Sequence, residues 1–248
     1  MALSDPVAIP SRGTEFVEVP AGGFRMGGVA EDKFVTAVEL PQRRVEVKAF
    51  ALGRAPVTRG EWRAVMGSLP PGSLPPGSPV GLAEDCPVVC VTFPEVMGFL
   101  RELGILRGVP CRLPSEAEWE YACRAGSSSV FPVGSRLEAG DANFLYDERG
   151  DAVGAGHLLP VGGYPANAFG LVDLLGNACE WTADLWHPGY DGAPADGTAW
   201  TIGGKPGCRV IRGGAWDHLP RVLRASWRDW APEQARWDNL GFRVARTL

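Results

Sequence analysis

The chain has 248 residues, 24 basic and 29 acidic side chains, and a formal net charge of −5 at pH 7. This balance excludes a protein that holds nucleic acid mainly through phosphate contacts, because such binding needs a basic surface. The 33 glycines and 22 prolines favour short strands and long ordered loops over a helical bundle.

Residues 1–15 carry prolines and acidic side chains but no apolar core of the kind that a signal peptide needs. No stretch approaches the roughly 18 apolar residues of a membrane-spanning helix. The six cysteines form no CxxC pair and, with the three histidines, no zinc-site spacing. We therefore expect a cytoplasmic protein with free thiols and no membrane insertion. Export by a route without such a signal is the alternative.

Three capping boxes predict three helix starts, because each places a hydroxyl residue three positions before a glutamate. They are Thr58 with Glu61, Thr92 with Glu95, and Ser115 with Glu118. Apolar residues at helical spacing follow the second box. Short strands are expected at residues 16–19, 44–47 and 88–91, where β-branched residues lie between clusters of turn formers.

Residues 67–71 read Gly-Ser-Leu-Pro-Pro, and residues 72–76 repeat them. The repeat predicts an extended, solvated insertion between the first two helices, and recruitment of a proline-binding partner is the alternative. No linker divides the chain. We therefore expect an N-terminal extension at residues 1–13 and a single domain at residues 14–248.

The C-terminal segment, residues 209–245, contains four of the nine tryptophans on a frame of glycine and arginine. Gly213, Gly214 and Gly241 mark positions where a residue without a Cβ fits best. Side chains between such fixed points are freer to serve a surface than a core. The segment is therefore the first candidate for a functional region.

Five blocks in order resemble the formylglycine-generating enzyme, or sulfatase-modifying-factor, family over residues 14 to 246. The blocks are residues 16–27, 56–62, 112–122, 167–181, and the pair 212–214 and 241–243. The resemblance implies an α+β fold of the C-type-lectin-like kind. It would have two main helices, short twisted antiparallel sheets and little regular structure.

Aerobic members of this family carry two cysteines shortly after the Arg-Gly-Gly block and bind copper through them, and Cu(I) prefers thiolates. Residues 215–222 contain no cysteine, and Cys179 and Cys208 lie before that stretch. We therefore expect no copper, no formylglycine generation and a non-enzymatic protein. The alternative is a metal-dependent oxidase or oxygenase related to sulfoxide synthases, with iron held by His218, Asp217 and a second histidine.

The segment also resembles the variable proteins of diversity-generating retroelements, which implies a ligand-binding surface of diversified residues. Tryptophan offers a large contact area at low entropic cost, and short polar side chains offer adaptable hydrogen bonds. The predicted ligand-binding residues are Trp216, Asp217, His218, Ser226, Trp227, Asp229, Trp230, Glu233, Gln234, Trp237, Asp238 and Asn239. Arg224, Arg228 and Arg243 are expected to scaffold the loops through backbone carbonyls. The expected partner is a protein or cell-surface molecule, and the sequence leaves the oligomeric state open.

The family resemblance further implies a structural calcium ion. Its ligands would come from Asp173, Gly176, Ala178 and Glu180. Two carboxylates with backbone carbonyls suit this hard, oxygen-preferring cation. A tight turn capped by carboxylates is the alternative for the same residues.

Overall fold

The computed structural model describes residues 15–29, 31–72 and 83–248. The predicted extension at residues 1–13 and most of the second Gly-Ser-Leu-Pro-Pro copy lie outside the described residues. No helix in the described part of the chain is long and apolar enough to cross a membrane.

Each of the three capping boxes begins an α-helix, as predicted. The helices are α1 (Arg59–Met66), α2 (Phe93–Arg107) and α3 (Glu116–Arg124). In every box the hydroxyl accepts a hydrogen bond from the third helical amide, and the side chain of the glutamate at that position accepts one from the backbone amide of the hydroxyl residue. Such a cap stabilises the helix by about 1 kcal/mol. Two short 3-10 helices, η1 (Ala37–Glu39) and η2 (Pro220–Val222), complete the helical structure of the described residues.

In the described part of the chain, nine short strands form three sheets. The first sheet joins β1 (Phe16–Val19), β4 (Phe50–Gly53) and β9 (Ala245–Thr247) in the order β1-β4-β9. The second pairs β2 (Gly22–Met26) with β3 (Arg43–Val47). The third has the order β7-β6-β5-β8, from β5 (Cys179–Trp186), β6 (Lys205–Arg212), β7 (Asp229–Pro232) and β8 (Leu240–Gly241). All pairs are antiparallel except β5 with β8.

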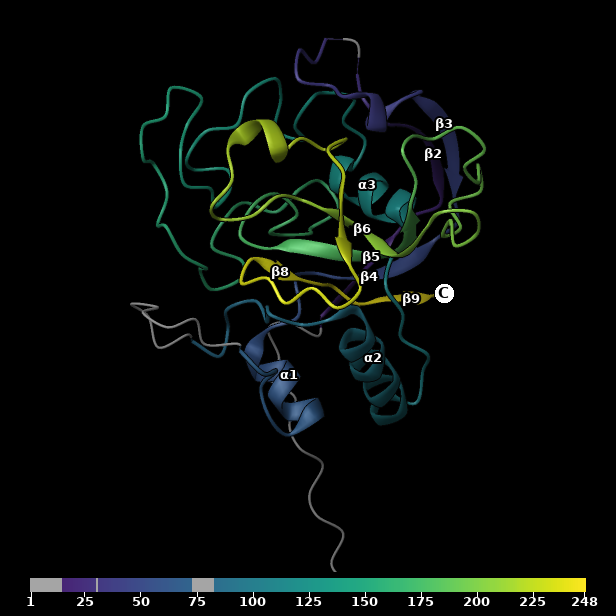
Figure 1. Cartoon of the computed structure of the whole chain (residues 1–248), viewed down its shortest axis with the longest axis vertical. Helices are drawn as coiled ribbons and strands as arrows, with labels where there is room; N and C mark the ends of the chain where they lie inside the picture. The colour runs from purple at the N-terminus through teal and green to yellow at the C-terminus, as the bar shows by residue number, and fades with distance from the viewer. Residues whose placement is uncertain (1–14, 30, 73–82) are drawn as a thin grey trace, which may run out of the picture.

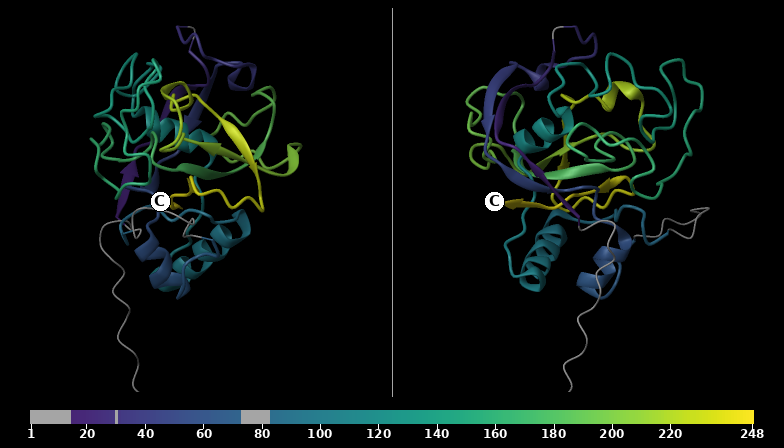
Figure 2. Two further views of the ribbon diagram at one scale, coloured as in Figure 1. Left: turned by 60° about the vertical axis from the view of Figure 1, so that its left-hand side comes forward. Right: turned by 180° about the vertical axis from the view of Figure 1, so that it is seen from behind.

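The helices lie on opposite sides of the sheet built by β5 and β6. Figures 1 and 2 show α1 and α2 together on one side and α3 on the other. In the first layer, the rings of Trp62 and Phe99 stack with their centroids 5.2 Å apart. Trp119 of α3 is fully buried in the second layer. The predicted α+β class is therefore confirmed, with a core on each side of the third sheet.

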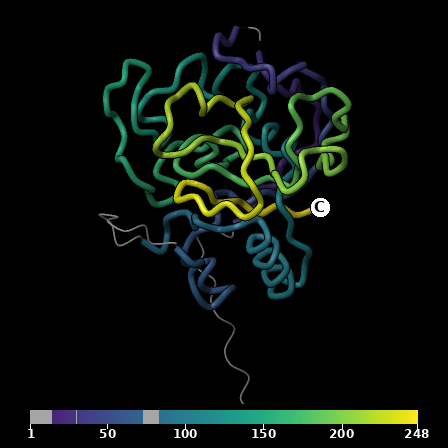
Figure 3. Tube along the Cα trace, in the orientation of Figure 1, coloured from purple at the N-terminus to yellow at the C-terminus, as the bar shows by residue number. Residues whose placement is uncertain are grey.

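Much of the remaining chain is irregular but ordered. Figure 3 shows the long course of residues 125–178, which contribute only isolated β-bridges among the described residues. This matches the expectation from the glycine and proline content.

Residues 88–91 do not form the predicted strand. They are buried, but their amides donate to loops: Val88 to the carbonyl of Val57, and Cys90 to that of Trp237. Cys90 also adopts a φ of 60°, which breaks an extended conformation. The apolar run indicated burial, and burial alone does not separate a strand from a packed loop.

Candidate functional site

Four arginines of the C-terminal segment are buried, and each pairs with a buried carboxylate from a distant part of the chain. The pairs are Arg212 with Glu120, Arg224 with Glu39, Arg228 with Glu116, and Arg243 with Glu180. The arginines also donate to backbone carbonyls, such as those of Arg221, Val38 and Gly53. The prediction that Arg224, Arg228 and Arg243 scaffold the loops is confirmed. We refer to these four pairs as the arginine frame.

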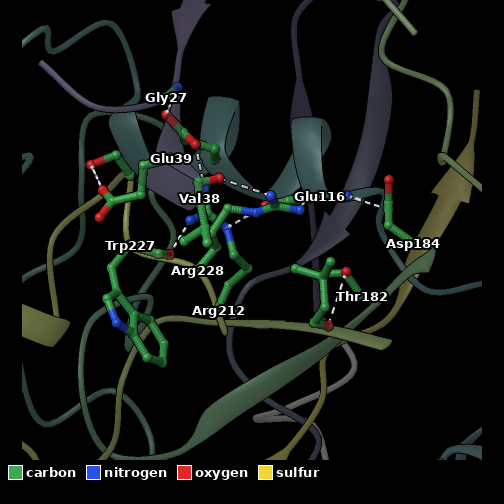
Figure 4. Close-up of polar contacts among 12 residues, drawn as sticks. Gly27, Val38, Glu39, Glu116, Thr182, Asp184, Arg212, Trp227 and Arg228 are labelled. Carbon is green, nitrogen blue, oxygen red and sulfur yellow. Dashed lines mark hydrogen bonds and ion pairs between the residues drawn. The ribbon is translucent and has the colours of Figure 1, made fainter. Parts of the chain in front are cut away.

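The frame positions the surface above it. Arg228 forms a fork on Glu116, with Nε 2.7 Å from Oε1 and Nη2 2.9 Å from Oε2. Arg212 donates to the backbone carbonyl of Trp227, and Figure 4 shows both contacts. Breaking such a buried pair typically costs about 3–5 kcal/mol, because the remaining charge stays uncompensated. Trp227 is thus anchored from below.

A tight turn over residues 215–218 places one imidazole at the surface of this frame. The amide of His218 donates to the carbonyl of Ala215 at 3.0 Å, and the amide of Ala215 donates to Nδ1 of His218 at 3.2 Å. Because Nδ1 accepts this bond, the proton of the neutral ring lies on Nε2. Burial lowers the pKa of His218 below its ordinary value, although Asp217 and Asp229 act in the opposite direction. The ring is therefore neutral at pH 7.

Polar side chains surround this imidazole. Oδ1 of Asp217 lies 3.9 Å from Nε2 of His218 and accepts a hydrogen bond from Nδ2 of Asn239 at 3.0 Å. The ring of Trp227 stands edge-on to the imidazole, with centroids 6.1 Å apart. Asp229, on β7, is exposed and close enough to act on the pKa of the ring.

A buried thiol lies beneath these groups at the start of β5. Burial raises the pKa of Cys179 well above its ordinary value, and the charges of Asp217 and Asp229 raise it further. Cys179 is therefore a thiol and not a thiolate at neutral pH. We call Cys179, Asp217, His218, Trp227, Asp229 and Asn239 the His218 cluster. The sequence alone gave Cys179 no role, because it occupies a position where the family it resembles usually has an aromatic residue.

The other predicted ligand-binding residues lie outside this cluster. Trp216 packs against a small core that includes Cys90 and Ala178. The ring of Trp230 lies 3.3 Å from Nζ of Lys205, and Glu233 is 2.7 Å from Nε of Arg209. Three predicted ligand-binding residues of the loop that follows are exposed: Gln234, Trp237 and Asp238.

Ser226 is a correction to the predicted surface. It is only 1% exposed, and its hydroxyl donates to Oε2 of Glu39 at 2.8 Å. The buried carboxylate of Glu39 needs several donors, and Ser226 supplies one beside Arg224. Its side chain therefore belongs to the arginine frame and cannot be displayed to a ligand.

The predicted calcium residues lie at the base of the same frame. Both oxygens of Glu180 accept hydrogen bonds from Arg243, and one also accepts from Nε1 of Trp119 at 2.7 Å. Oδ2 of Asp173 accepts from the amide of Gly162 at 2.6 Å, and burial raises the pKa of Asp173. Glu180 thus offers little uncompensated charge to a cation. Calcium binding through Asp173, Gly176, Ala178 and Glu180 stays a prediction.

The donor set does not fit the transition metals considered from the sequence. Among the described residues, no three His, Cys, Asp or Glu side chains are grouped so that they could hold a metal ion. His187 does not serve such a site, because its ring is stacked on Trp200 and its ring nitrogens face the carbonyls of Leu185 and Ile202. The iron site imagined from His218, Asp217 and another histidine is therefore not formed by these residues.

Comparison with known proteins identifies relatives along nearly the whole chain. A family model described as the sulfatase-modifying factor enzyme 1-like domain matches residues 4–248. Hercynine oxygenase from Mycolicibacterium smegmatis is 31% identical over 97% of this chain, which spans 63% of that enzyme's length. PvdO from Pseudomonas aeruginosa is 34% identical, with a TM-score of 0.85 over 99% of this chain and 100% of that one.

Variable protein 1 from Treponema denticola has a similar structure, with a TM-score of 0.77 over 94% of this chain and 95% of that one. At 22% identity this likeness concerns the fold. The expectation of a non-enzymatic protein is wrong, because a named oxygenase is similar to almost the entire chain. The missing cysteine pair argued only against one copper-dependent reaction, and a shared fold supports many others.

Proposed function

The chain belongs to the sulfatase-modifying factor enzyme 1-like family, and we propose that it is an oxidase or oxygenase that binds its substrate at the His218 cluster. The observation that carries this proposal is the cluster itself. It gathers a neutral imidazole, two exposed carboxylates and a protonated thiol above a frame of buried ion pairs. Similarity to hercynine oxygenase supports the reaction class.

The residues of the cluster have distinct roles in this proposal. Nε2–H of His218 donates a hydrogen bond to the substrate, because Nδ1 is already bound to the amide of Ala215. Asp217, held by Asn239, and Asp229 accept hydrogen bonds from the substrate and attract positive charge. Trp227 provides a less polar wall, and the buried Cys179 lies beneath the cluster without being open to the substrate. We assign these residues binding, orientation and proton transfer only, since they do not form a copper or iron site.

Preorganisation comes from the arginine frame. The frame fixes the carbonyl of Trp227 and pins residues 224–228 through pairs that are almost wholly buried. A catalytic group held within about 0.5 Å of its productive position needs such a rigid support. The buried ion pairs therefore hold the residues of the cluster in fixed positions.

A diversified display surface is a weaker candidate for the same residues. Five of the twelve predicted ligand-binding residues are exposed, namely Asp217, Asp229, Gln234, Trp237 and Asp238. The others are partly or fully buried, several in contacts that a changed residue would lose. Display of variable side chains favours positions that tolerate replacement, and this segment offers few of them.

The test is oxygen-dependent turnover in a mixture of many candidate substrates. The full chain is incubated with a small-molecule extract of the producing cells under ¹⁸O₂, and products are followed by mass spectrometry. We expect a protein-dependent product that has gained labelled oxygen or lost two hydrogens. His218→Ala should lower its rate about 100-fold, as removal of a proton-transfer group does.

Arg101→Gln, on the exposed face of α2, is the matched control and should leave the rate unchanged. Asp217→Asn should slow the reaction with little change in folding, since Asp217 is exposed. Equal rates for wild type and His218→Ala would place the chemistry elsewhere. No oxygen-dependent product from the wild type would contradict the reaction class.

A further inference from the structure

A hollow lies away from the His218 cluster, between β2 and the end of α3. Its volume is about 510 Å³. This size falls within the range of about 300–1,000 Å³ that is usual for small-molecule sites. The residues that carry the inference are Phe24, Arg25, Glu31, Tyr121 and Phe169, all of which line the hollow.

Three aromatic rings form one wall of the hollow. Phe24 and Tyr121 have ring centroids 5.3 Å apart at an interplanar angle of 49°, and Tyr121 and Phe169 are 5.8 Å apart at 55°. Phe24 and Phe169 are only partly buried, so part of each ring is open to the hollow. Such a group favours an apolar, planar ring in a ligand, because aromatic rings pack well in tilted and edge-to-face arrangements.

The hydroxyl of Tyr121 has no hydrogen-bond partner among the described residues, although the side chain is only 8% exposed. The hydroxyl oxygen is not fully enclosed by protein atoms, and Tyr121 lines the hollow, so this oxygen is open to the hollow. A Cβ at position 22 would lie 2.5 Å from this oxygen, so the hydroxyl lies directly against the backbone of Gly22. A nearly buried tyrosine hydroxyl usually binds a partner, and here a ligand would supply it.

Two oppositely charged side chains of the lining also lack an ion-pair partner among the described residues. Arg25 and Glu31 are exposed, and neither forms an ion pair with a described residue. The other cation of the lining, Arg124, is buried and engaged: it pairs with Glu120 at 2.9 Å, a carboxylate that it shares with Arg212, and it donates to the carbonyls of Ser129 and Gly27. Among the described residues that line it, the hollow therefore offers one exposed cation and one exposed anion without an ion pair, beside an aromatic wall.

We propose that this hollow binds an aromatic amino acid in its zwitterionic form. The ring lies against Phe24, Tyr121 and Phe169, the carboxylate pairs with Arg25, and the ammonium pairs with Glu31. A ligand with a single charge would satisfy only one of the two side chains. No residue of this site belongs to the His218 cluster, so the inference stands apart from the proposed oxidase or oxygenase activity.

Four probes with the same ring and two-carbon chain test the assignment: L-phenylalanine, 3-phenylpropionate, phenethylamine and 2-phenylethanol. Binding to the full chain is measured by NMR titration. We expect L-phenylalanine to bind most tightly and 2-phenylethanol most weakly. Arg25→Gln should weaken L-phenylalanine and 3-phenylpropionate about two- to fivefold and leave phenethylamine unchanged, as the loss of an exposed ion pair predicts.

Glu31→Gln should give the opposite selectivity, weakening L-phenylalanine and phenethylamine but not 3-phenylpropionate. Tyr121→Phe keeps the aromatic wall and should weaken L-phenylalanine by removing the hydroxyl. Arg101→Gln on α2 is the control and should change no affinity. Equal affinities for all four probes would overturn the zwitterion assignment. If none of the four probes bound, the site itself would be overturned. Neither result bears on turnover at the His218 cluster.

Discussion

The arginines of the arginine frame and most residues of the His218 cluster lie in residues 209–245. Charged side chains are buried and paired in the frame, whereas they are exposed in the cluster. In the frame, Arg212, Arg224, Arg228 and Arg243 are buried and each has a carboxylate partner. In the cluster, Asp217 and Asp229 are exposed. Among the described residues, the only basic side chain within ion-pair distance of either carboxylate is His218, which is neutral at pH 7. The difference shows how residues 209–245 can combine a rigid, buried set of ion pairs with carboxylates that are open to solvent.

The energetic consequence is a separation of stability from function. A buried charge that loses its partner keeps its desolvation cost, whereas an exposed charge is already solvated. Substitutions in the frame should therefore affect the free energy of unfolding. Substitutions in the cluster should affect binding and turnover while the fold survives.

The largest expected effect is in the frame. Arg228→Met leaves Glu116 buried without its forked partner and should lower the free energy of unfolding by about 3–5 kcal/mol. Urea denaturation followed by far-UV circular dichroism measures this change. Arg101→Met, in an exposed pair with Glu102, is the control and should cost less than about 1 kcal/mol. Similar losses in both variants would remove the distinction between frame and surface.

A pH effect should follow from Asp184, which accepts hydrogen bonds from the amides of Glu116 and Trp200. Burial, with a further contribution from Glu116, raises its pKa from 3.8 to about 7. The folded state thus holds this proton more tightly than the unfolded state. The stabilisation is complete below pH 3.8 and is lost as the pH rises to about 7, with a slope of at most about 1.4 kcal/mol per pH unit.

Asp184→Asn tests this dependence. The variant should show a flatter curve of unfolding free energy against pH between pH 4 and 7 than the wild type. Glu61, whose pKa burial raises to about 7 at the start of α1, contributes to the same window, so some slope should remain in the variant. An unchanged curve in Asp184→Asn would show that Asp184 is ionised in the folded protein.

A smaller effect should distinguish Ser226 from the displayed residues. Ser226→Ala removes a donor to the buried carboxylate of Glu39 and should cost about 1.5–3 kcal/mol. Asn239→Ala, which removes the contact with exposed Asp217, should cost less in the same denaturation experiment. A loss for Asn239→Ala as large as that for Ser226→Ala would contradict the assignment of Ser226 to the frame.

The smallest effect concerns the imidazole of the cluster. Burial lowers the pKa of His218 and Asp229 opposes that effect, so Asp229→Asn should lower the pKa further. The change is measured by NMR titration of the ring protons. Gln234→Ala, outside the cluster, should leave the titration unchanged. An unchanged pKa in Asp229→Asn would show that Asp229 does not act on the ring.

Local features could be predicted from particular residues. Thr58, Thr92 and Ser115 each begin a helix, because a capping box satisfies backbone donors within a few residues of itself. The strand at residues 16–19 is also where its alternation places it. The apolar run at residues 88–91 failed as a strand prediction because, in the described part of the chain, its amides bond to loops and not to a neighbouring strand.

The candidate site could be predicted only in part. Asp217, His218 and Trp227 stand in the segment that composition singled out, whereas Cys179 joins them because β5 and β6 pair side by side. Ser226 was misplaced because its burial depends on Glu39, which lies 187 residues away. Sequence proximity carries no information about such partners.

By itself, the sequence determined the helix starts, since these depend on local hydrogen bonding, and residue type singled out residues 209–245 as the candidate segment. The α+β class was implied by the resemblance of five blocks to a known family. Only the tertiary structure decided which polar side chains are buried and paired. Charge pairing in a low-dielectric interior depends on distance in space, and elements far apart along the chain supply both partners. The same reason separates the displayed Asp217 from the enclosed Ser226 within one segment.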